Sequence, residues 1–352
     1  MERCEKKVLL LAPPFYALHD QIRSALEKQC YKVTFIPDLL QKYNPNFSTS
    51  SLASLKKTYY NICQPNLRYL NQYQNEANCE YDYFVCINGY SFHPSLLKSL
   101  RRVNSNIKAV LYLWDGLSFF DFSKTFSYFD SIFTFDYKDA LEKNIKYLPL
   151  YWIRNKRCGL VNDKKYDLSF IGTLHSDRFR LISKIVSQCN DLNLKYFIKL
   201  VYRERKLSLL DSIRYMYYKK KNNPSAIAFI DEFKILQGNV TADYLCNTPL
   251  SSKDVESVIE NSRCVLDVEL PYQTGLTNRM ISSMGNGKKV ITTNKAIKDT
   301  PLWDENNICC IDRETPVLDS DFIYSDYIPN PVIVDYLGSL RIDNWIKTLL
   351  NG

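Results

Sequence analysis

Short apolar runs alternate with longer segments of helical spacing along this chain of 352 residues. Each run is apolar at nearly every position, which is typical of a β-strand buried on both faces. In the first 150 residues these runs occupy Lys7–Ala12, Tyr31–Pro37, Tyr83–Ile87, Ala109–Trp114, Ser131–Phe135 and Lys146–Leu150. Helical spacing is found at Ile22–Gln29, Ser50–Gln74 and Pro94–Val103. Because strands that alternate with helices pair in parallel, the pattern predicts a doubly wound α/β sheet.

A second series of the same kind follows a polar, basic stretch at 153–166, which we interpret as a linker. Its predicted strands are Asp167–Ile171, Lys195–Val201, Cys264–Val268 and Lys289–Thr293, and its predicted helices are Arg178–Cys189, Ser252–Ser262, Asn278–Met284 and Ile342–Leu350. A chain of 352 residues is also about the length of two domains. We therefore predict Rossmann-like domains at residues 1–152 and 167–335, facing each other across a cleft, and a C-terminal helix within 336–352.

Composition and charge exclude several classes of protein. Hydrophobic residues make up 45% of the chain and charged residues 24%, which excludes a disordered, collagen-like or small disulfide-bonded protein. The net charge of +8 is a mild excess, well below that of a histone-like protein. It allows an anionic partner such as a nucleotide, a phosphate or an acidic lipid surface, and we expect no nucleic-acid partner.

Cysteine and histidine give no sign of a metal site. The 11 cysteines include no C-x-x-C pair, which is typical of reduced cysteines in an intracellular protein. None of the three histidines has metal-ligand spacing from a cysteine or another histidine, so we expect no bound metal. No apolar run approaches the ~20 residues of a membrane span, and Pro13 and Pro14 end the first run too early for a signal peptide. We expect a cytoplasmic protein, either free or on the inner face of the membrane.

Residues 203–221 concentrate positive charge. Seven basic and two acidic residues give this segment a local charge of 7 − 2 = +5, and Tyr215, Tyr217 and Tyr218 are interleaved with them. One interpretation is contact with an anionic membrane surface. The other is a solvated helix face whose tyrosines pack inward.

The segment from Asp267 to Asn294 is the most informative for chemistry. The chain has no G-x-G-x-x-G after its first strand and no Walker A loop, so neither nucleotide motif applies. Here a strand ends near Glu269, and the turn Thr274, Gly275, Leu276, Thr277 leads into a helix. Backbone N–H groups at a helix start bind diphosphate, Arg279 lies within reach of the same anion, and Glu269 is placed to accept hydrogen bonds from sugar hydroxyls. The alternative is a generic strand–turn–helix element without a ligand.

Several separated segments resemble one protein family. They are LYLWD (Leu111–Asp115), FDSIFTFD (Phe129–Asp136), YLPLYW (Tyr147–Trp152), DLSFIGTLHSDR (Asp167–Arg178) and QTGLTNRMISSMGNGKKVITTNK (Gln273–Lys295). In this order they resemble the bacterial glycosyltransferases of capsule and lipopolysaccharide biosynthesis related to the CgeB-like family, which have the GT-B fold of two Rossmann-like domains. The resemblance implies a nucleotide-diphosphate sugar as co-substrate, held by the second domain, and no further cofactor. It implies a growing surface glycan, free or lipid-linked, as acceptor.

The family pattern extends the candidate site and also marks a departure. Gly172, Thr173, His175 and Arg178 follow the first strand of the second domain and become donor-binding candidates, although a capped helix with an exposed His and Arg is the alternative. Many GT-B donor sites have a glutamate in the helix where this chain has Ser282. The resemblance therefore makes Ser282 a weaker ribose-binding candidate.

In the first domain, residues after the predicted strands supply candidates for the transfer step. An inverting transfer needs a base for the acceptor hydroxyl, and Asp115, directly after a strand, is the best-placed acid, with His93 and Asp20 in reserve. Capping of the next segment is the alternative role for Asp115. Phe15, Tyr90 and Trp114 are candidates for stacking against an acceptor, or else core aromatics.

These patterns together predict a metal-independent glycosyltransferase. Two alternatives stay open on the same fold. One is a non-catalytic protein that binds nucleotides or glycans, which the serine at 282 favours. The other is an enzyme like the nucleotide-sugar 2-epimerases, for which this chain has few acid or base groups.

Overall fold

The computed structural model describes residues 6–15, 18–38, 74–154, 164–221 and 224–352. The chain divides into two compact units. The first unit consists of residues 1–151 and 339–352, and the second consists of residues 152–338. The predicted helical segment Ser50–Gln74 lies outside the described residues except for Gln74, where a short helix begins.

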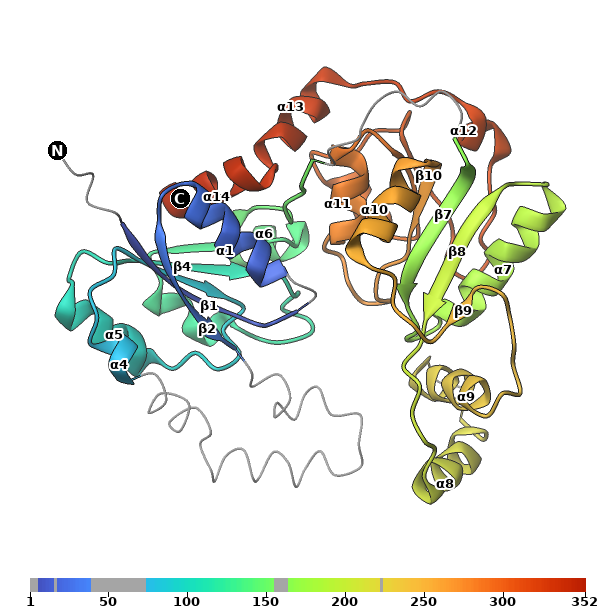
Figure 1. Ribbon diagram of the computed structural model, residues 1–352, viewed down its shortest axis with the longest axis horizontal. Helices are drawn as coiled ribbons and strands as arrows, with labels where there is room; N and C mark the ends of the chain where they lie inside the picture. Colours follow the sequence, from blue (N-terminus) through green and yellow to red (C-terminus); the bar gives the residue numbers. More distant parts are fainter. Residues whose placement is uncertain (1–5, 16–17, 39–73, 155–163, 222–223) are drawn as a thin grey trace. The chain divides into compact units, whose positions relative to one another are not determined.

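The first unit is built on a six-stranded parallel sheet of order β2-β1-β3-β4-β5-β6 (Figure 1). Its strands are β1 (Lys7–Ala12), β2 (Lys32–Pro37), β3 (Tyr83–Ile87), β4 (Lys108–Leu113), β5 (Ser131–Thr134) and β6 (Lys146–Tyr147). The helices are α1 (Leu18–Lys28), α4 (Gln74–Ala77), α5 (Pro94–Val103), α6 (Tyr137–Lys143) and α14 (Ile342–Asn351), with a 3-10 turn at Ser123–Tyr128. The predicted parallel α/β sheet is confirmed, and β3 and α5 have the predicted bounds.

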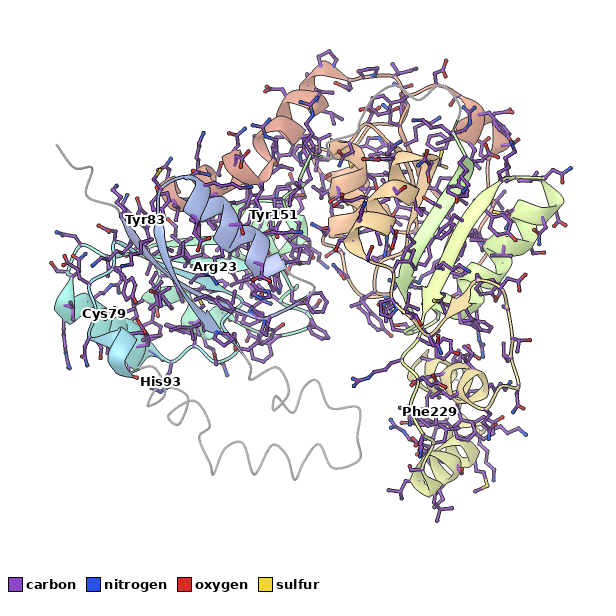
Figure 2. All side chains as sticks on the ribbon, in the orientation of Figure 1. Arg23, Cys79, Tyr83, His93, Tyr151 and Phe229 are labelled. Carbon is purple, nitrogen blue, oxygen red and sulfur yellow. The ribbon has the colours of Figure 1, made fainter. Side chains whose placement is uncertain are left out.

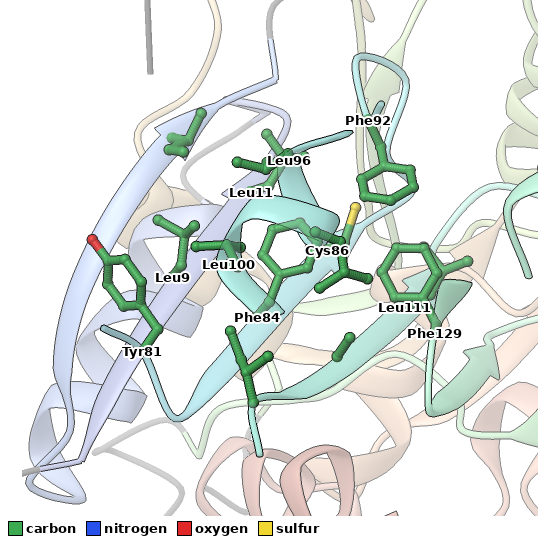
Figure 3. Packing of buried hydrophobic residues seen from close by; sticks show 14 of the residues in the cluster. Leu9, Leu11, Tyr81, Phe84, Cys86, Phe92, Leu96, Leu100, Leu111 and Phe129 are labelled. Carbon is green, nitrogen blue, oxygen red and sulfur yellow. The ribbon is translucent and has the colours of Figure 1, made fainter. Parts of the chain in front are cut away.

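The core of the first unit explains why its strands read as continuous apolar runs. Leu9, Phe84, Cys86 and Leu111 from three neighbouring strands pack together (Figure 3). The amphipathic helix α5 covers them with Leu96, Leu97 and Leu100. On α14, Trp345 is fully buried, and its ring nitrogen donates a hydrogen bond of 2.9 Å to the carbonyl oxygen of Pro149. The C-terminal helix thus completes the first unit.

The second unit has a parallel sheet of order β12-β11-β10-β7-β8-β9. Its strands are β7 (Tyr166–Thr173), β8 (Tyr196–Val201), β9 (Leu245–Cys246), β10 (Ser262–Asp267), β11 (Lys289–Thr292) and β12 (Ile308–Cys310). Chain order runs outward in both directions from the pair β7 and β10, as in a Rossmann fold. The point where the strand order reverses is where open α/β sheets bind ligands, beyond the carboxyl ends of the strands.

Helices flank this second sheet. They are α7 (Arg178–Asp191), α10 (Ser252–Glu260), α11 (Asn278–Gly285) and α12 (Ser320–Tyr324), with a 3-10 turn at Lys295–Asp299. The helix α13 (Pro331–Ser339) follows α12 in the chain. Leu181, Ile182 and Ile185 of α7 pack against Leu168 and Phe170 of β7. This packing fixes the start of α7 beside the end of β7, where the candidate residues lie.

Between β8 and β9 the chain forms a helical pair, α8 (Leu209–Tyr218) and α9 (Pro224–Leu236), drawn in yellow in Figure 1. A capping box starts α8, in which Ser208 and Asp211 bond each other's backbone N–H groups. Phe229 of α9 contacts Tyr218 of α8 with ring centroids 5.5 Å apart (Figure 2). None of the helices that the structure describes is long and apolar enough to span a bilayer.

Candidate functional site

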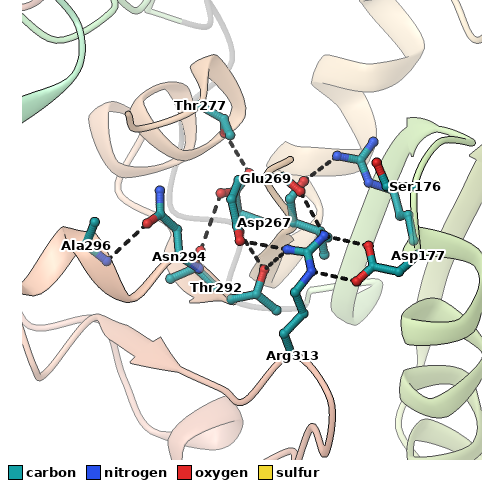
Figure 4. Close-up of polar contacts among 12 residues, drawn as sticks. Ser176, Asp177, Asp267, Glu269, Thr277, Thr292, Asn294, Ala296 and Arg313 are labelled. Atoms are coloured by element: carbon teal, nitrogen blue, oxygen red, sulfur yellow. Dashed lines mark hydrogen bonds and ion pairs between the residues drawn. The ribbon is translucent and has the colours of Figure 1, made fainter. Parts of the chain in front are cut away.

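Asp267 is the centre of a polar network at the carboxyl end of β10. Its side chain is fully buried. One carboxylate oxygen accepts hydrogen bonds from Thr277 Oγ1 at 2.6 Å and from Arg279 Nη1 at 3.0 Å, and the other accepts one from Thr292 Oγ1 at 3.4 Å (Figure 4). A buried carboxylate needs such partners because burial removes its hydration. In the sequence, Asp267 marks only the start of the motif, and the local pattern does not indicate this role.

Thr277 and Arg279 connect this carboxylate to the start of α11. Thr277 is the N-cap, and its hydroxyl accepts a hydrogen bond from the backbone N–H of Met280. Arg279 donates a second hydrogen bond of 2.9 Å to the carbonyl oxygen of Ile171, and its guanidinium lies 4.8 Å from the ring centroid of Phe170. The predicted helix start is confirmed. Arg279 also links the ends of β7 and β10.

The turn that precedes α11 is held by Asn294. The side-chain amide of Asn294 donates hydrogen bonds to the carbonyl oxygens of Thr274, at 3.2 Å, and Gly275, at 3.3 Å. Leu276 is buried and anchors the turn from below. Asn294 also caps the 3-10 turn that follows β11 by accepting a hydrogen bond from Ala296 N (Figure 4). Asn294 therefore links the turn before α11 to the segment that follows β11.

Glu269 is held by two residues of the chain itself. Its carboxylate accepts hydrogen bonds from Arg313 Nη1 at 2.7 Å and from Thr293 Oγ1 at 2.5 Å. Both oxygens are thus engaged and the side chain is 7% exposed, so it anchors Arg313, and its role toward sugar hydroxyls stays a prediction. Burial raises the pKa of Glu269, against the opposing effects of Thr293 and Arg313.

Arg313, which the sequence analysis missed, joins Glu269 to Asp177. Its Nε and Nη2 atoms donate to the two oxygens of Asp177 at 2.7 and 2.8 Å. Burial alone would raise the pKa of Asp177, but the hydrogen bonds and charge of Arg313 outweigh it and lower that pKa. One feature of the sequence could have indicated Arg313. It lies just after the short strand β12, and so at the same edge of the sheet as Asp177 and Glu269.

Arg178 and His175 lie in the same positive environment. Arg178 is buried and donates hydrogen bonds to the carbonyl oxygens of Thr173, at 2.8 Å, and Val268, while its Nε has no hydrogen-bond partner among the described residues. Burial, followed by the charge of Arg279, lowers the pKa of Arg178 to about 9. Burial and the charges of the three arginines lower the pKa of His175 to about 3. His175 is therefore neutral at pH 7, and Arg178 clamps two strand ends rather than standing exposed.

Gly172 and Ser282 serve packing in this structure. A Cβ at Gly172 would lie 2.6 Å from Cζ of Phe170 and 3.2 Å from Nη2 of Arg279. The absence of a side chain at Gly172 thus leaves room for the side chains of Phe170 and Arg279. Ser282 lies one turn into α11, with its hydroxyl 3.4 Å from Oδ1 of Asn278.

In the first unit, Asp115 is held by Asn88 and Tyr90. Its Oδ2 accepts hydrogen bonds from Asn88 Nδ2 at 2.7 Å and from the Tyr90 hydroxyl. The amide oxygen of Asn88 accepts from the backbone N–H groups of Trp114, at 2.9 Å, and Asp115, at 3.3 Å, which ties the ends of β3 and β4 together. Burial raises the pKa of Asp115, whereas the hydrogen bonds that its carboxylate accepts from Tyr90 and Asn88 act to lower it. Among the contacts within the described residues, no hydrogen bond reaches Oδ1 of Asp115, so this oxygen is free to accept a proton.

The other first-unit candidates occupy different environments. His93 is the N-cap of α5, and its Nδ1 accepts a hydrogen bond of 3.3 Å from Ser95 N. Tyr90 is 4% exposed and Trp114 is 9% exposed, so neither ring offers the open face that stacking on an acceptor needs. Their burial matches the alternative of core aromatics, and the stacking role of those two residues stays a prediction. Phe15 is 46% exposed, so its ring is accessible for stacking on an acceptor.

Comparisons with known proteins identify the fold. No protein-family model and no curated protein sequence matches the chain. A solved structure titled OtsA apo structure is 11% identical over 98% of both chains, with a TM-score of 0.55. AviGT4, described as a glycosyltransferase involved in avilamycin A biosynthesis, is 9% identical over 98% of this chain and 96% of its own, with a TM-score of 0.54. The chain has the two-domain α/β fold of the GT-B glycosyltransferases, as predicted, whereas its place in the CgeB-like family stays a prediction.

Proposed function

We propose that this chain is a glycosyltransferase that transfers a sugar from a nucleotide-diphosphate sugar to a growing surface polysaccharide. The second unit would hold the donor at the carboxyl ends of β7 and β10, and the first unit would hold the acceptor. The GT-B fold supports the reaction class, because AviGT4, which shares it, is a glycosyltransferase. Fold alone does not assign an activity, so the site must carry the proposal.

The observation that carries it is the cluster of three arginines at the strand-order reversal of the second sheet. Arg279 pairs with Asp267, Arg313 pairs with Asp177 and Glu269, and Arg178 donates hydrogen bonds to two carbonyl oxygens. After the effect of burial, the charges of these arginines lower the pKa of His175, and the charge of Arg279 lowers that of Arg178. A diphosphate brought to this place would be attracted by the arginines and by the amino terminus of α11.

These groups define the part each unit would take in the reaction. Asp115 would accept the proton of the acceptor hydroxyl, whose oxygen forms a bond to the anomeric carbon of the donor sugar. The bond from that carbon to the diphosphate breaks, and the nucleoside diphosphate leaves with the bonding electrons. The arginines and the start of α11 would stabilise the negative charge on the leaving group. Because cations of the chain neutralise the diphosphate, we expect activity to persist after treatment with a chelator.

A binding experiment with a matched pair of variants tests the donor site. A panel of nucleoside diphosphates and nucleotide sugars is screened by thermal unfolding, where a ligand at 100 times its Kd adds about 2.7 kcal/mol. Replacement Arg279→Lys keeps a cation near Asp267 and should weaken binding less than Arg279→Ala, for which we expect about 1.5–3 kcal/mol. Arg263→Ala is the control, because Arg263 pairs with Asp167 near the opposite end of β10.

The outcomes separate the proposal from its rivals. Unchanged affinity in both Arg279 variants would exclude this site for the diphosphate. Nucleotide binding without release of nucleoside diphosphate, with or without glycan acceptors, would identify a non-catalytic binding protein instead. Conversion of a nucleotide sugar to its epimer would identify the 2-epimerase alternative.

A further inference from the structure

Helix α8 presents an apolar face to solvent. Five of its residues are exposed: Leu209 by 79%, Leu210 by 75%, Ile213 by 51%, Met216 by 62% and Tyr217 by 58%. At about 100° per residue these positions fall within an arc of about 120° around the helix axis. An apolar stripe of that width normally faces a protein core. Here it is outside.

The opposite face of α8 packs against α9. Tyr215 stacks on Phe233 of α9 with ring centroids 4.5 Å apart. The guanidinium of Arg214 lies 4.7 Å from the ring centroid of Phe229. Asp211 pairs with Arg205 at 2.9 Å. Two of the three tyrosines that the sequence analysis singled out thus pack against α9, and Tyr217 does not.

Basic side chains adjoin the exposed stripe. Lys219, Lys220 and Lys221 follow the last turn of α8 and are exposed. The ammonium group of Lys221 lies 5.1 Å from the ring centroid of Tyr217, which places a cation beside the apolar stripe. No ion pair to these three lysines is formed within the described residues. Apolar side chains next to unpaired cations are the composition of helices that lie in the surface of an anionic bilayer.

We propose that α8 docks on an anionic lipid surface, with its five exposed apolar residues inserted among the headgroups and Lys219–Lys221 against the lipid phosphates. A second copy of this chain suits the face less well, because a symmetric contact would bring two lysine clusters together. Tyr217 is also suited to the interface between water and lipid. This inference is independent of the glycosyltransferase proposal, but it would bring a transferase to lipid-linked acceptors.

The test is sedimentation of the full chain with two kinds of vesicle. One is phosphatidylcholine alone, and the other also contains about 30% phosphatidylglycerol, which is on the order of the physiological content of anionic lipid. We expect binding to the anionic vesicles that weakens with added salt. Changing Lys219, Lys220 and Lys221 to Gln should reduce partitioning by about fivefold per lysine, or about 100-fold together. Changing Leu210, Ile213 and Met216 to Gln should reduce it at least about tenfold at any salt concentration.

Matched controls keep the result interpretable. Val332→Gln and Val334→Gln change residues of α13 that are 77% and 47% exposed, and they should leave vesicle binding unchanged. Gln favours helix, so circular dichroism should show all variants folded. Wild-type protein that stays in the supernatant at low salt overturns the proposal. Undiminished binding by the variant with Gln at 210, 213 and 216 also overturns it. A lipid-free dimer that this variant dissociates would assign the face to a second copy, and also overturns it.

Discussion

The guanidinium of Arg313 and the carboxylate of Asp177 form two hydrogen bonds, 2.7 Å from Nε and 2.8 Å from Nη2, across 136 residues of sequence. The remaining nitrogen of Arg313, Nη1, bonds Glu269. One cation therefore fixes the loops that follow β7, β10 and β12 at one edge of the second sheet. The planar, five-donor fork of arginine is what allows two carboxylates to share it.

We predict that Arg313→Ala lowers the free energy of unfolding by about 3 kcal/mol at pH 7, because it leaves Glu269 buried without its cation. Arg313→Lys keeps a charge but loses the paired geometry, so we expect an intermediate loss. Urea unfolding of both variants beside Arg263→Ala measures the difference. A loss no larger than that of the control would mean that the network contributes nothing to stability.

Stability should also depend on pH through His175. In the folded chain its pKa is lowered to about 3, whereas an unfolded histidine has a pKa of about 6.5. Between these values the unfolded chain binds a proton that the folded chain does not. The stability that neutral His175 contributes is therefore complete above pH 6.5 and is lost as the pH falls, by up to about 1.4 kcal/mol per pH unit.

Replacing His175 by Asn removes this titration. Unfolding by urea at pH 7, 5.5 and 4.5 should show a shallower decline for His175→Asn than for wild type, and the carboxylates common to both cancel in the comparison. Parallel declines would show that His175 titrates normally. Addition of a nucleoside diphosphate should raise the pKa of His175, because it opposes the arginine charges that lower it.

Gly172→Ala distinguishes packing from ligand approach. The new methyl group would lie 2.6 Å from Cζ of Phe170, so we expect a loss of about 1–3 kcal/mol of stability without any ligand present. Combining it with Phe170→Leu should recover part of that loss. If Gly172→Ala unfolds like wild type and only nucleotide affinity falls, the glycine serves the ligand after all.

Elements with a complete apolar pattern were predictable, whereas the short edge strand β12 was not. The strand Tyr83–Ile87 and the helix Pro94–Val103 have the predicted bounds, because their apolar patterns are complete within the segment itself. The strand β12 (Ile308–Cys310) has three residues and is the edge strand of its sheet, so it is too short for its burial to produce a clear apolar pattern. Missing that strand also meant missing Arg313.

The site was predictable in location but not in its pairings. The order of strands and helices placed Asp115 and Glu269 at the carboxyl ends of parallel strands and Arg279 near the start of the helix that follows. It gave no means of knowing that Glu269 would bond Arg313, 44 residues later. Nor could it show that Tyr90 would turn its hydroxyl to Asp115 instead of its ring to an acceptor. Such pairings depend on distances between strand ends, which local patterns do not contain.

Asp115 is the residue that we propose as the base for the acceptor hydroxyl. Asp115→Asn should keep the fold and nucleotide binding but lower turnover by about 10²–10⁴, because the amide cannot accept the proton of the acceptor hydroxyl. Glu142→Gln is the control, since Glu142 is an exposed acid of the same unit, 56% exposed. Turnover is measured as nucleoside diphosphate released in the presence of acceptor. Near-normal turnover of Asp115→Asn would move the role to His93 or Asp20.

Tyr90→Phe tests the same assignment through pH. A base works ionised, so turnover falls as the pH falls through its pKa, and burial raises the pKa of Asp115 above its ordinary value. The Tyr90 hydroxyl stabilises the ionised form and so holds that pKa down. Without it, the acidic limb of the pH–turnover profile should move to higher pH, while turnover at alkaline pH approaches that of wild type. A limb that stays in place would show that the group titrating in the reaction is not Asp115.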